Sequence, residues 1–191
     1  INNAGFGISG AIEFTPPQEA RRQFDVNFFG MVNMNRAVLP VMRQQGGGRI
    51  VNMSSVAAPI AIPFQAYYSA SKAAVRTYSL ALASEVRPFG IEVCVIMPGD
   101  IATGFTAARR KSCGGDDVYN GRIARSVAVM EHDERTGMSA QFAGQFVARR
   151  ATQKHPKLIC TMGRKYALFV FLMRILPTRT ATRIVGRIYA S

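Results

Sequence analysis

The chain has 191 residues and a mass of 20.9 kDa, which is the size of one ordinary domain. Hydrophobic residues make up 48% and charged residues 18%, which excludes a disordered chain, and the glycine and proline numbers exclude a collagen-like one. The three cysteines lack the paired short spacing of a disulfide scaffold or a zinc site. We therefore expect a folded domain with reduced thiols, located in the cytoplasm.

The charge is unevenly spread along the chain. The formal net charge is +13, of which residues 1–100 carry +2 and residues 101–191 carry +11. From residue 155 to residue 191 there are seven Lys or Arg residues and no carboxylate. Such a region attracts phosphate on a nucleotide, on nucleic acid or on an anionic bilayer, and it is equally compatible with a solvated face.

The opening residues look like a strand entered partway along. Ile1 is followed directly by Asn2-Asn3-Ala4-Gly5, without the charged and apolar regions of a signal peptide. We therefore expect a fragment or a processed chain. No apolar run reaches the roughly 18 residues that are needed to span a bilayer.

In the first half, strands and helices alternate. Apolar residues at helical spacing predict helices over residues 25–45 and 65–86. Short apolar runs rich in β-branched residues predict strands over residues 49–54 and 91–97. Strands of this kind, apolar on both faces, are typical of a parallel sheet that is covered by helices on both sides.

The second half continues the alternation less regularly. The remaining predicted elements are a polar segment over residues 103–118, helices over residues 120–130 and 139–152, a strand over residues 157–162, and an apolar, arginine-rich tail over residues 164–191. We therefore expect an α/β domain over residues 1–163. The tail resembles an amphipathic surface helix that packs on the domain, on a second subunit or on a membrane.

Two side chains near the start of the second helix point to chemistry. Tyr68 and Lys72 are four residues apart, so they project from the same face about one turn apart. An ammonium group close to a phenol favours the phenolate. Lys72 is therefore predicted to lower the pKa of Tyr68 from about 10 toward the range of a general acid–base. Pairs at this spacing are common on helix surfaces, so the pair alone does not identify a site.

Other polar residues fall where the predicted strands end. Ser55 follows the second strand, at the carboxyl edge where open α/β sheets bind ligands. Asn2-Asn3-Ala4-Gly5 closes the opening strand, and Pro98-Gly99 closes the next one, with Thr103 shortly after. We expect these residues, together with Asn27 of the first helix, to converge on one rim of the sheet.

These motifs resemble the short-chain dehydrogenase/reductase family, which consists of nicotinamide-dependent oxidoreductases with a Rossmann fold. The matching residues are Asn2-Asn3-Ala4-Gly5 for the N-N-A-G motif, Asn27 for the helix asparagine, Ser55 for the active-site serine, Tyr68 and Lys72 for Y-x-x-x-K, and Pro98-Gly99-Asp100-Ile101-Ala102-Thr103 for P-G-x-[IV]-x-T. Tyr67 is rejected because it would pair with Ser71. The match runs from residue 1 to about residue 105.

The family's glycine-rich T-G-x-x-x-G-x-G turn would precede residue 1. The resemblance therefore implies a doubly wound Rossmann sheet whose first β-α-β-α-β half is missing from this chain. The residue that would choose between NAD and NADP is missing with it.

The resemblance implies a role for each matching residue. Tyr68 would be the general acid–base, Ser55 would hydrogen-bond the substrate oxygen, and Lys72 would also bind the nicotinamide ribose. Asn27 would hold a helix irregularity and a proton-relaying water. The implied binding residues for NAD or NADP are Asn3, Ala4, Gly5, Tyr68, Lys72, Pro98, Gly99, Ile101 and Thr103. No metal is expected.

The resemblance also implies that residues 104–135 cap the substrate. This segment would contribute Phe105, Val118, Tyr119, Val127 and Met130. That apolar mixture, with the apolar tail, favours a lipophilic alcohol, ketone or aldehyde as the substrate. A homodimer or homotetramer is the expected assembly.

Two rival interpretations remain. A non-catalytic relative, acting as a binding or scaffold module, would usually lose Ser55, Tyr68 or Lys72, and all three are present. The basic tail suggests a binder of phosphate surfaces, but no motif for nucleic acid is found. Peripheral membrane contact by residues 164–191 is compatible with an enzyme. His132 and His155 lie in charged surroundings and are expected to be solvated.

Overall fold

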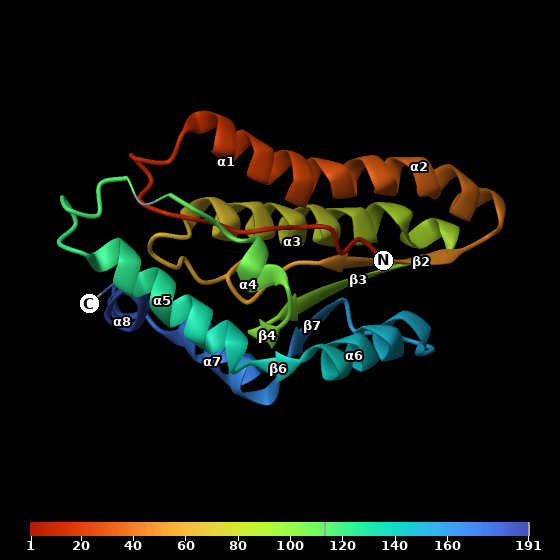
Figure 1. Cartoon of the computed structure of the whole chain (residues 1–191). Helices are drawn as coiled ribbons and strands as arrows, with labels where there is room; N and C mark the ends of the chain where they lie inside the picture. The colour runs from red at the N-terminus through yellow and green to blue at the C-terminus, as the bar shows by residue number, and fades with distance from the viewer. Residues whose placement is uncertain (113, 191) are drawn as a thin grey trace.

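The computed structural model describes residues 1–112 and 114–190 (Figure 1). Cys113, one of the three cysteines expected to be unpaired, and Ser191, the last residue of the predicted tail, lie outside the described residues. In chain order the elements are β1 (Ile8–Ser9), α1 (Pro17–Phe24), the π-helical turn η1 (Asp25–Phe29), α2 (Gly30–Gln44), β2 (Gly48–Met53), α3 (Ala66–Val86), the 3₁₀ turn η2 (Arg87–Phe89), β3 (Ile91–Pro98), β4 (Ile101–Ala102), α4 (Phe105–Ala108), β5 (Arg110–Lys111), α5 (Arg122–Arg135), β6 (Met138–Ser139), α6 (Ala140–Thr152), β7 (Ile159–Met162), α7 (Arg164–Ile175) and α8 (Thr178–Tyr189).

A three-stranded parallel sheet, in the order β2-β3-β7, forms the centre of the molecule. The opening segment runs beside β2 through a parallel bridge between Asn2 and Asn52. Because all of these strands are parallel, their carboxyl ends meet at one edge. Two shorter parallel pairs, β1 with β5 and β4 with β6, lie outside this sheet.

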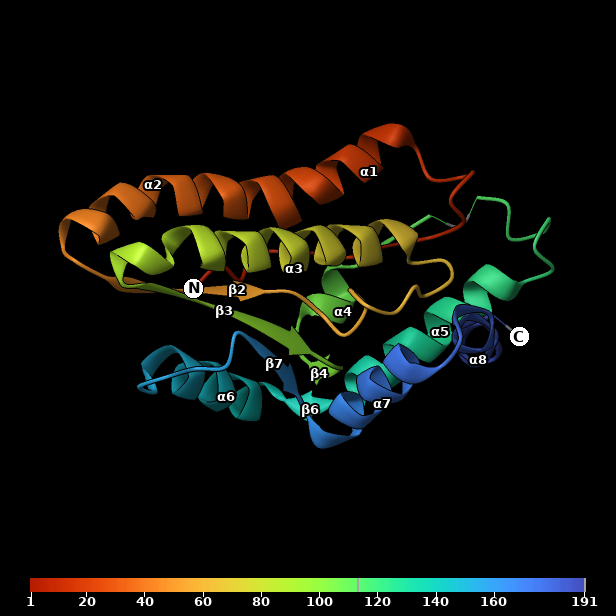
Figure 2. The ribbon, with the colours of Figure 1, turned by 180° about the vertical axis from the view of Figure 1, so that it is seen from behind.

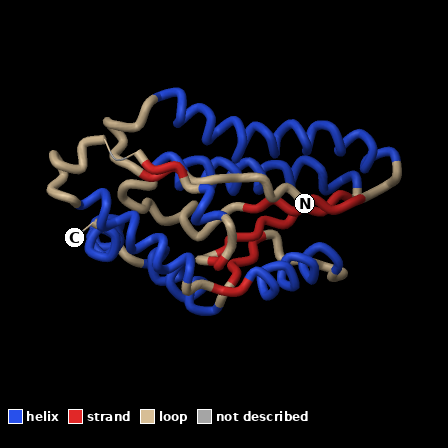
Figure 3. The backbone as a smooth tube through the Cα atoms, in the orientation of Figure 1, coloured by secondary structure: helices blue, strands red, loops and turns tan. Residues whose placement is uncertain are grey.

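Helices cover both faces of the sheet, as the sequence predicts. The continuous helix α1-η1-α2 and the long helix α3 lie on one side, and α6 lies on the other (Figures 1 and 2). Figure 3 shows the strands as a narrow band between these two layers. One apolar cluster fills the space under α6, around Val51, Ile96 and Met162, and a second lies between the sheet, α2 and α3, around Ile50 and Leu82. The predicted α/β fold is confirmed.

Several predicted elements differ from the structure. The helix predicted over residues 120–130 continues to Arg135, and the segment predicted as polar over residues 103–118 contains α4 and β5. The first long helix begins at Pro17, eight residues before its predicted start, because proline's fixed φ suits the first turn of a helix. The tail forms two helices instead of one. They are separated at Leu176 and Pro177, since proline cannot donate the amide hydrogen bond that a continuous helix needs. No helix among the described residues is long and apolar enough to cross a membrane.

Candidate active site

A cavity of about 750 Å³ lies at the carboxyl edge of the sheet. The sequence-predicted residues that line it are Asn3, Gly5, Ser55, Tyr68, Lys72, Pro98, Gly99, Ile101 and Thr103. Ala4 and Asn27 were predicted with them but are not part of the lining. The strand ends thus bring nearly all of the predicted residues to one place, over almost 100 residues of chain.

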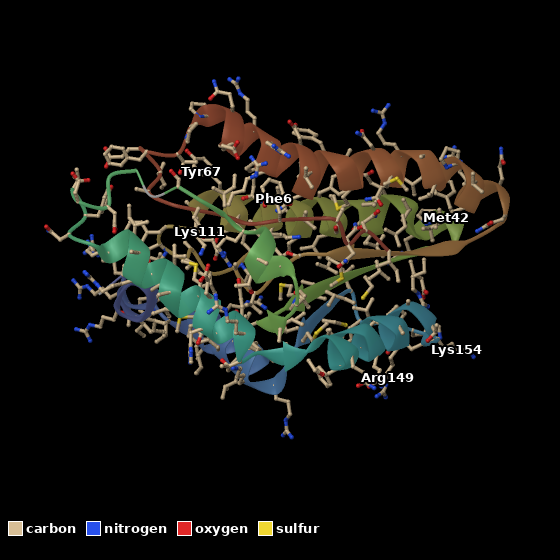
Figure 4. The ribbon with its side chains drawn as sticks, in the orientation of Figure 1. Phe6, Met42, Tyr67, Lys111, Arg149 and Lys154 are labelled. Carbon is tan, nitrogen blue, oxygen red and sulfur yellow. The ribbon has the colours of Figure 1, made fainter. Side chains whose placement is uncertain are left out.

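The Tyr68 and Ser55 side chains both line the cavity, and the Ser55 hydroxyl lies close enough to the Tyr68 phenol to lower its pKa. Tyr68 lies in the first turn of α3, and Ser55 lies two residues beyond the end of β2, where its Oγ also accepts the backbone N–H of Ala57 (3.1 Å). The neighbouring Tyr67, which is labelled in Figure 4, has its hydroxyl 3.4 Å from the carbonyl oxygen of Ile12. The choice of Tyr68 over Tyr67 therefore agrees with the geometry.

Lys72 is buried behind Tyr68, with 5% of its surface exposed. Its Nζ donates to the carbonyl of Met53 (2.9 Å) and lies 5.8 Å from the centre of the Tyr68 ring. Gly5 approaches from the opposite side, and a Cβ at this position would lie 3.4 Å from Nζ and 3.2 Å from Oδ1 of Asn27. The absence of a side chain at residue 5 therefore keeps the space beside the ammonium group open.

The pKa values of the two residues are set by burial. Burial raises the pKa of Tyr68 to about 12. The nearby Ser55 hydroxyl and Arg109 guanidinium lower this pKa, but they offset the effect of burial only in part. Burial likewise lowers the pKa of Lys72 to about 8. The prediction that Lys72 lowers the pKa of Tyr68 below its usual value is wrong, because the cost of desolvating the phenolate outweighs the favourable neighbours. Tyr68 is therefore protonated at neutral pH.

Asn27 holds the opening segment against α3. It lies within the π-helical turn η1, so the predicted helix irregularity is present. Its Oδ1 accepts the backbone N–H of Phe6 (3.0 Å), and its Nδ2 donates to the carbonyl of Phe6 (3.0 Å) and to Ser71 Oγ (3.2 Å). Asn27 thus supports the cavity from behind Gly5 rather than lining it.

A layer of buried amides, which the sequence analysis missed, extends this support. Asn2 donates both to Asn35 Oδ1 and to Asn52 Oδ1, at 2.8 Å each, and Asn52 donates to Ser79 Oγ (2.9 Å). Asn35 and Asn52 are completely buried. Asparagines inside otherwise apolar helix and strand patterns are the signal that could have revealed this layer, since buried polar groups need partners.

On the other side of the cavity, Arg109, which directly follows α4, forms a buried ion pair with Glu134 of α5. The Phe105 ring packs edge-on against Tyr68, with 5.7 Å between ring centres, and the Arg109 guanidinium lies 5.6 Å from the centre of the Phe105 ring. Arg109 donates to Ser9 Oγ (2.7 Å) and pairs with Glu134. Burial raises the pKa of Glu134, whereas Arg109 lowers it. The sequence analysis did not identify Arg109 or Glu134.

The end of β3 meets α7. The Tyr166 ring packs directly against Gly99, where any Cβ would collide with it, and Tyr166 Oη donates to Asp100 Oδ2 (2.8 Å). Burial raises the pKa of both Asp100 and Tyr166. Thr103 Oγ1 accepts the backbone N–H of Phe105 (3.2 Å). Gly99 and Thr103 therefore both have structural partners within the chain, in addition to facing the cavity.

The predicted capping segment contributes only in part. Phe105 and Met130 line the cavity, but Val118, Tyr119 and Val127 do not. Val118 is 65% exposed. The Tyr119 hydroxyl donates to Glu13 (2.7 Å), because this turn packs against the segment before α1 instead. The rest of the apolar wall comes from elsewhere in the chain, including Val56, Ile60, Ile62, Val147, Met162 and Phe169.

Other predicted features are placed as follows. His132 and His155 are exposed. Cys94 and Cys160 are buried free thiols. Within residues 1–112 and 114–190, no cluster of His, Cys, Asp and Glu side chains has the arrangement of a metal site.

The chain is similar to known proteins of one family. The family model described as short chain dehydrogenase matches residues 1–114. A 3-ketodihydrosphingosine reductase from Bacteroides thetaiotaomicron is 44% identical over 165 residues, and the alignment covers 85% of this chain and 61% of that protein. The chain thus spans about three fifths of the length of that relative.

Solved structures show the same fold. A short-chain dehydrogenase from Streptomyces avermitilis superimposes with a TM-score of 0.81 at 29% identity, covering 97% of this chain and 68% of that one. The closed form of a serine dehydrogenase complexed with NADP+ superimposes with a TM-score of 0.70 at 26% identity, covering 84% of this chain and 62% of that one.

Proposed function

Because the chain belongs to the short-chain dehydrogenase family, a family of oxidoreductases, we propose that the protein interconverts an alcohol and a ketone or aldehyde with NAD or NADP. The observation that carries the proposal is that Ser55, Tyr68 and Lys72 line one cavity, with the Ser55 hydroxyl close to the Tyr68 phenol. A proton donor and a second hydroxyl that share one cavity are what the reduction of a carbonyl group requires.

The residues beside Lys72 fit the nicotinamide end of such a cofactor. Gly5 leaves the space next to the ammonium group open, and Asn3 lines the same wall. Within the described part of the chain, Lys72 Nζ makes one hydrogen bond, to Met53, which leaves two N–H donors for ribose hydroxyls. When bound, the cofactor supplies or accepts the hydride.

The chain's own residues handle the proton and the oxygen. In the direction of reduction, Tyr68 Oη donates its proton to the substrate carbonyl oxygen. Ser55 Oγ donates a hydrogen bond to the same oxygen, which stabilises the negative charge that develops there. We propose reduction as the direction, because the relative that is 44% identical is named a reductase.

We further propose a long-chain, lipophilic ketone as the substrate. The wall of the cavity away from Lys72 is apolar and includes Ile60, Met130 and Phe169. A relative that is 44% identical is named a 3-ketodihydrosphingosine reductase, and that ketone carries a long alkyl chain. The cavity and the relative's name support the same class of substrate.

The test is the oxidation of NADH or NADPH in the presence of long-chain ketones, with Tyr68→Phe compared with the wild-type protein. Removing the proton donor is expected to lower kcat by about 10²–10⁴-fold. Tyr67→Phe is the matched control, because the Tyr67 hydroxyl contacts the carbonyl of Ile12 outside the cavity, and it is expected to keep its activity. Equal rates for wild type and Tyr68→Phe would contradict the assignment of Tyr68 as the proton donor.

A further inference from the structure

Helix α7 is apolar on both of its sides. Its inner side contributes Tyr166 and Phe169 to the cavity wall. Its outer side presents an exposed stripe, called here the outer stripe, at spacings of three and four residues: Leu168, Phe171, Leu172 and Ile175, which are 60%, 58%, 41% and 62% exposed. A helix that is apolar all round is normally covered on every side, so this stripe indicates a contact with another surface.

Helix α8 adds a row of positive charge. Arg179, Arg183 and Arg187 recur every four residues and are exposed, while Val185 and Tyr189 face inward. The end of α8 is tied to α5 by a hydrogen bond from Arg122 Nε to the carbonyl of Ala190 (2.7 Å), so the row has a defined position.

Helices α7 and α8 carry an excess of positive charge. Together α7 and α8 carry six cations, namely Arg164, Lys165, Arg174, Arg179, Arg183 and Arg187. None of the six forms an ion pair with any residue that the structure describes, and residues 155–191 contain no carboxylate. Figure 2 shows both helices at the edge of the molecule, on the side away from α1 and α2.

We propose that α7 and α8 dock the protein on an anionic lipid bilayer. The outer stripe would enter the region between headgroups and acyl chains, and the cations would contact lipid phosphates. Charge complementarity favours this occupant. A second copy of the chain would set six positive charges against six others, whereas an anionic headgroup layer neutralises them.

Docking also brings the cavity close to the lipid. The helices that carry the outer stripe and the arginine row form part of the cavity wall through Tyr166, Phe169 and Tyr189. A lipophilic ketone dissolved in the bilayer would therefore reach the cavity without crossing bulk water. This last step rests on the proposed function, whereas the docking surface itself does not.

The experiment is co-flotation of the purified protein with vesicles of phosphatidylcholine alone or mixed with phosphatidylglycerol. Binding is expected only to the mixed vesicles, and it should weaken as the salt concentration rises. A triple Arg179→Gln, Arg183→Gln, Arg187→Gln variant should bind about 100-fold more weakly, because each basic residue near an anionic surface contributes about 1 kcal/mol. The matched control replaces Arg21, Arg22 and Arg36, which are exposed on α1 and α2, by Gln, and its binding should be unchanged.

A second pair of variants tests the apolar part of the surface. Phe171→Gln with Ile175→Gln should weaken binding at least 10-fold, since both side chains would lose their place in the bilayer. Met34→Gln with Val41→Gln removes similarly exposed side chains from α2 and should have no effect on vesicle binding.

Three results would overturn the proposal. These are the absence of binding to anionic vesicles, equal binding by the outer-stripe variants and their controls, and a lipid-free dimer that the outer-stripe variants dissociate. Reduction of a water-soluble ketone separates this proposal from the proposed function. The outer-stripe variants should retain that activity, whereas Tyr68→Phe should lose it while still binding vesicles.

Discussion

The two walls of the cavity are held in place in different ways. On the sheet side, buried amides bond the opening segment to the helices and to β2, as Asn27 does for Phe6 and as Asn52 does for Ser79. On the cap side, apolar side chains pack around one buried ion pair between Arg109 and Glu134. Hydrogen bonds are directional, so the wall that they build can hold Ser55, Tyr68 and Lys72 in a narrow geometry. Apolar packing accepts more variation in shape, which suits the wall that meets the substrate.

The largest effect is expected on the cap side, from Arg109→Met. This change leaves Glu134 as a buried carboxylate without its partner, which should lower the free energy of unfolding by about 3–5 kcal/mol. Arg110→Met is the matched control. It removes a partly exposed ion pair with Glu19, which should cost about 1 kcal/mol or less. Urea denaturation measures the free energy of unfolding of both variants. Equal losses of stability would mean that the ion pair between Arg109 and Glu134 does not stabilise the cap side of the cavity.

A smaller loss is expected on the sheet side, from Asn27→Ala. The change removes three hydrogen bonds and leaves the N–H of Phe6 unpaired, whereas the carbonyl of Phe6 keeps its hydrogen bond from Gln23 Nε2. The loss should cost about 2–3 kcal/mol. Faster hydrogen exchange at the Phe6 amide would locate the damage in the opening segment. Asn33→Ala, at an exposed position of α2, should change stability by less than about 0.5 kcal/mol. If the rate of hydrogen exchange at the Phe6 amide were the same in Asn27→Ala as in the wild-type protein, Asn27 would not support this wall.

The smallest effect is a pH dependence that comes from Lys72. Its pKa falls from an ordinary 10.5 to about 8 in the folded protein, so between these values the unfolded chain binds more protons and stability rises with pH. Relative to Lys72→Met, the wild-type protein should therefore gain about 2 kcal/mol between pH 8 and pH 10.

The comparison with the variant is needed because Tyr68 and Cys94, whose pKa values burial raises, act in the opposite direction at high pH. Lys154→Met, at an exposed position labelled in Figure 4, should show the same dependence of stability on pH as the wild-type protein. A constant difference between wild type and Lys72→Met would show that the ammonium group is not desolvated.

Local patterns were sufficient for the order of the central elements and for the edge of the sheet at which the site lies. Periodicity located the strands β2 and β3 and the helix α3 within two residues, because each pattern reports on neighbours in the same segment. In a parallel sheet the carboxyl ends of the strands meet, so residues placed just after β2 and β3 had to lie together. The place of Ser55 at this edge was therefore predictable before any coordinates, whereas the choice of Tyr68 and Lys72 came from the resemblance to the family.

Only the tertiary structure decided which distant residues are in contact and how burial shifts the pKa values of the site. The pairing of Arg109 with Glu134 joins residues 25 apart, and the hydrogen bond from Tyr166 to Asp100 joins residues 66 apart, and no spacing rule connects either pair. The direction of the Tyr68 pKa shift likewise depends on how completely the surrounding walls exclude water. Desolvation is a property of the whole enclosure, whereas the sequence shows only that a lysine stands one helical turn away.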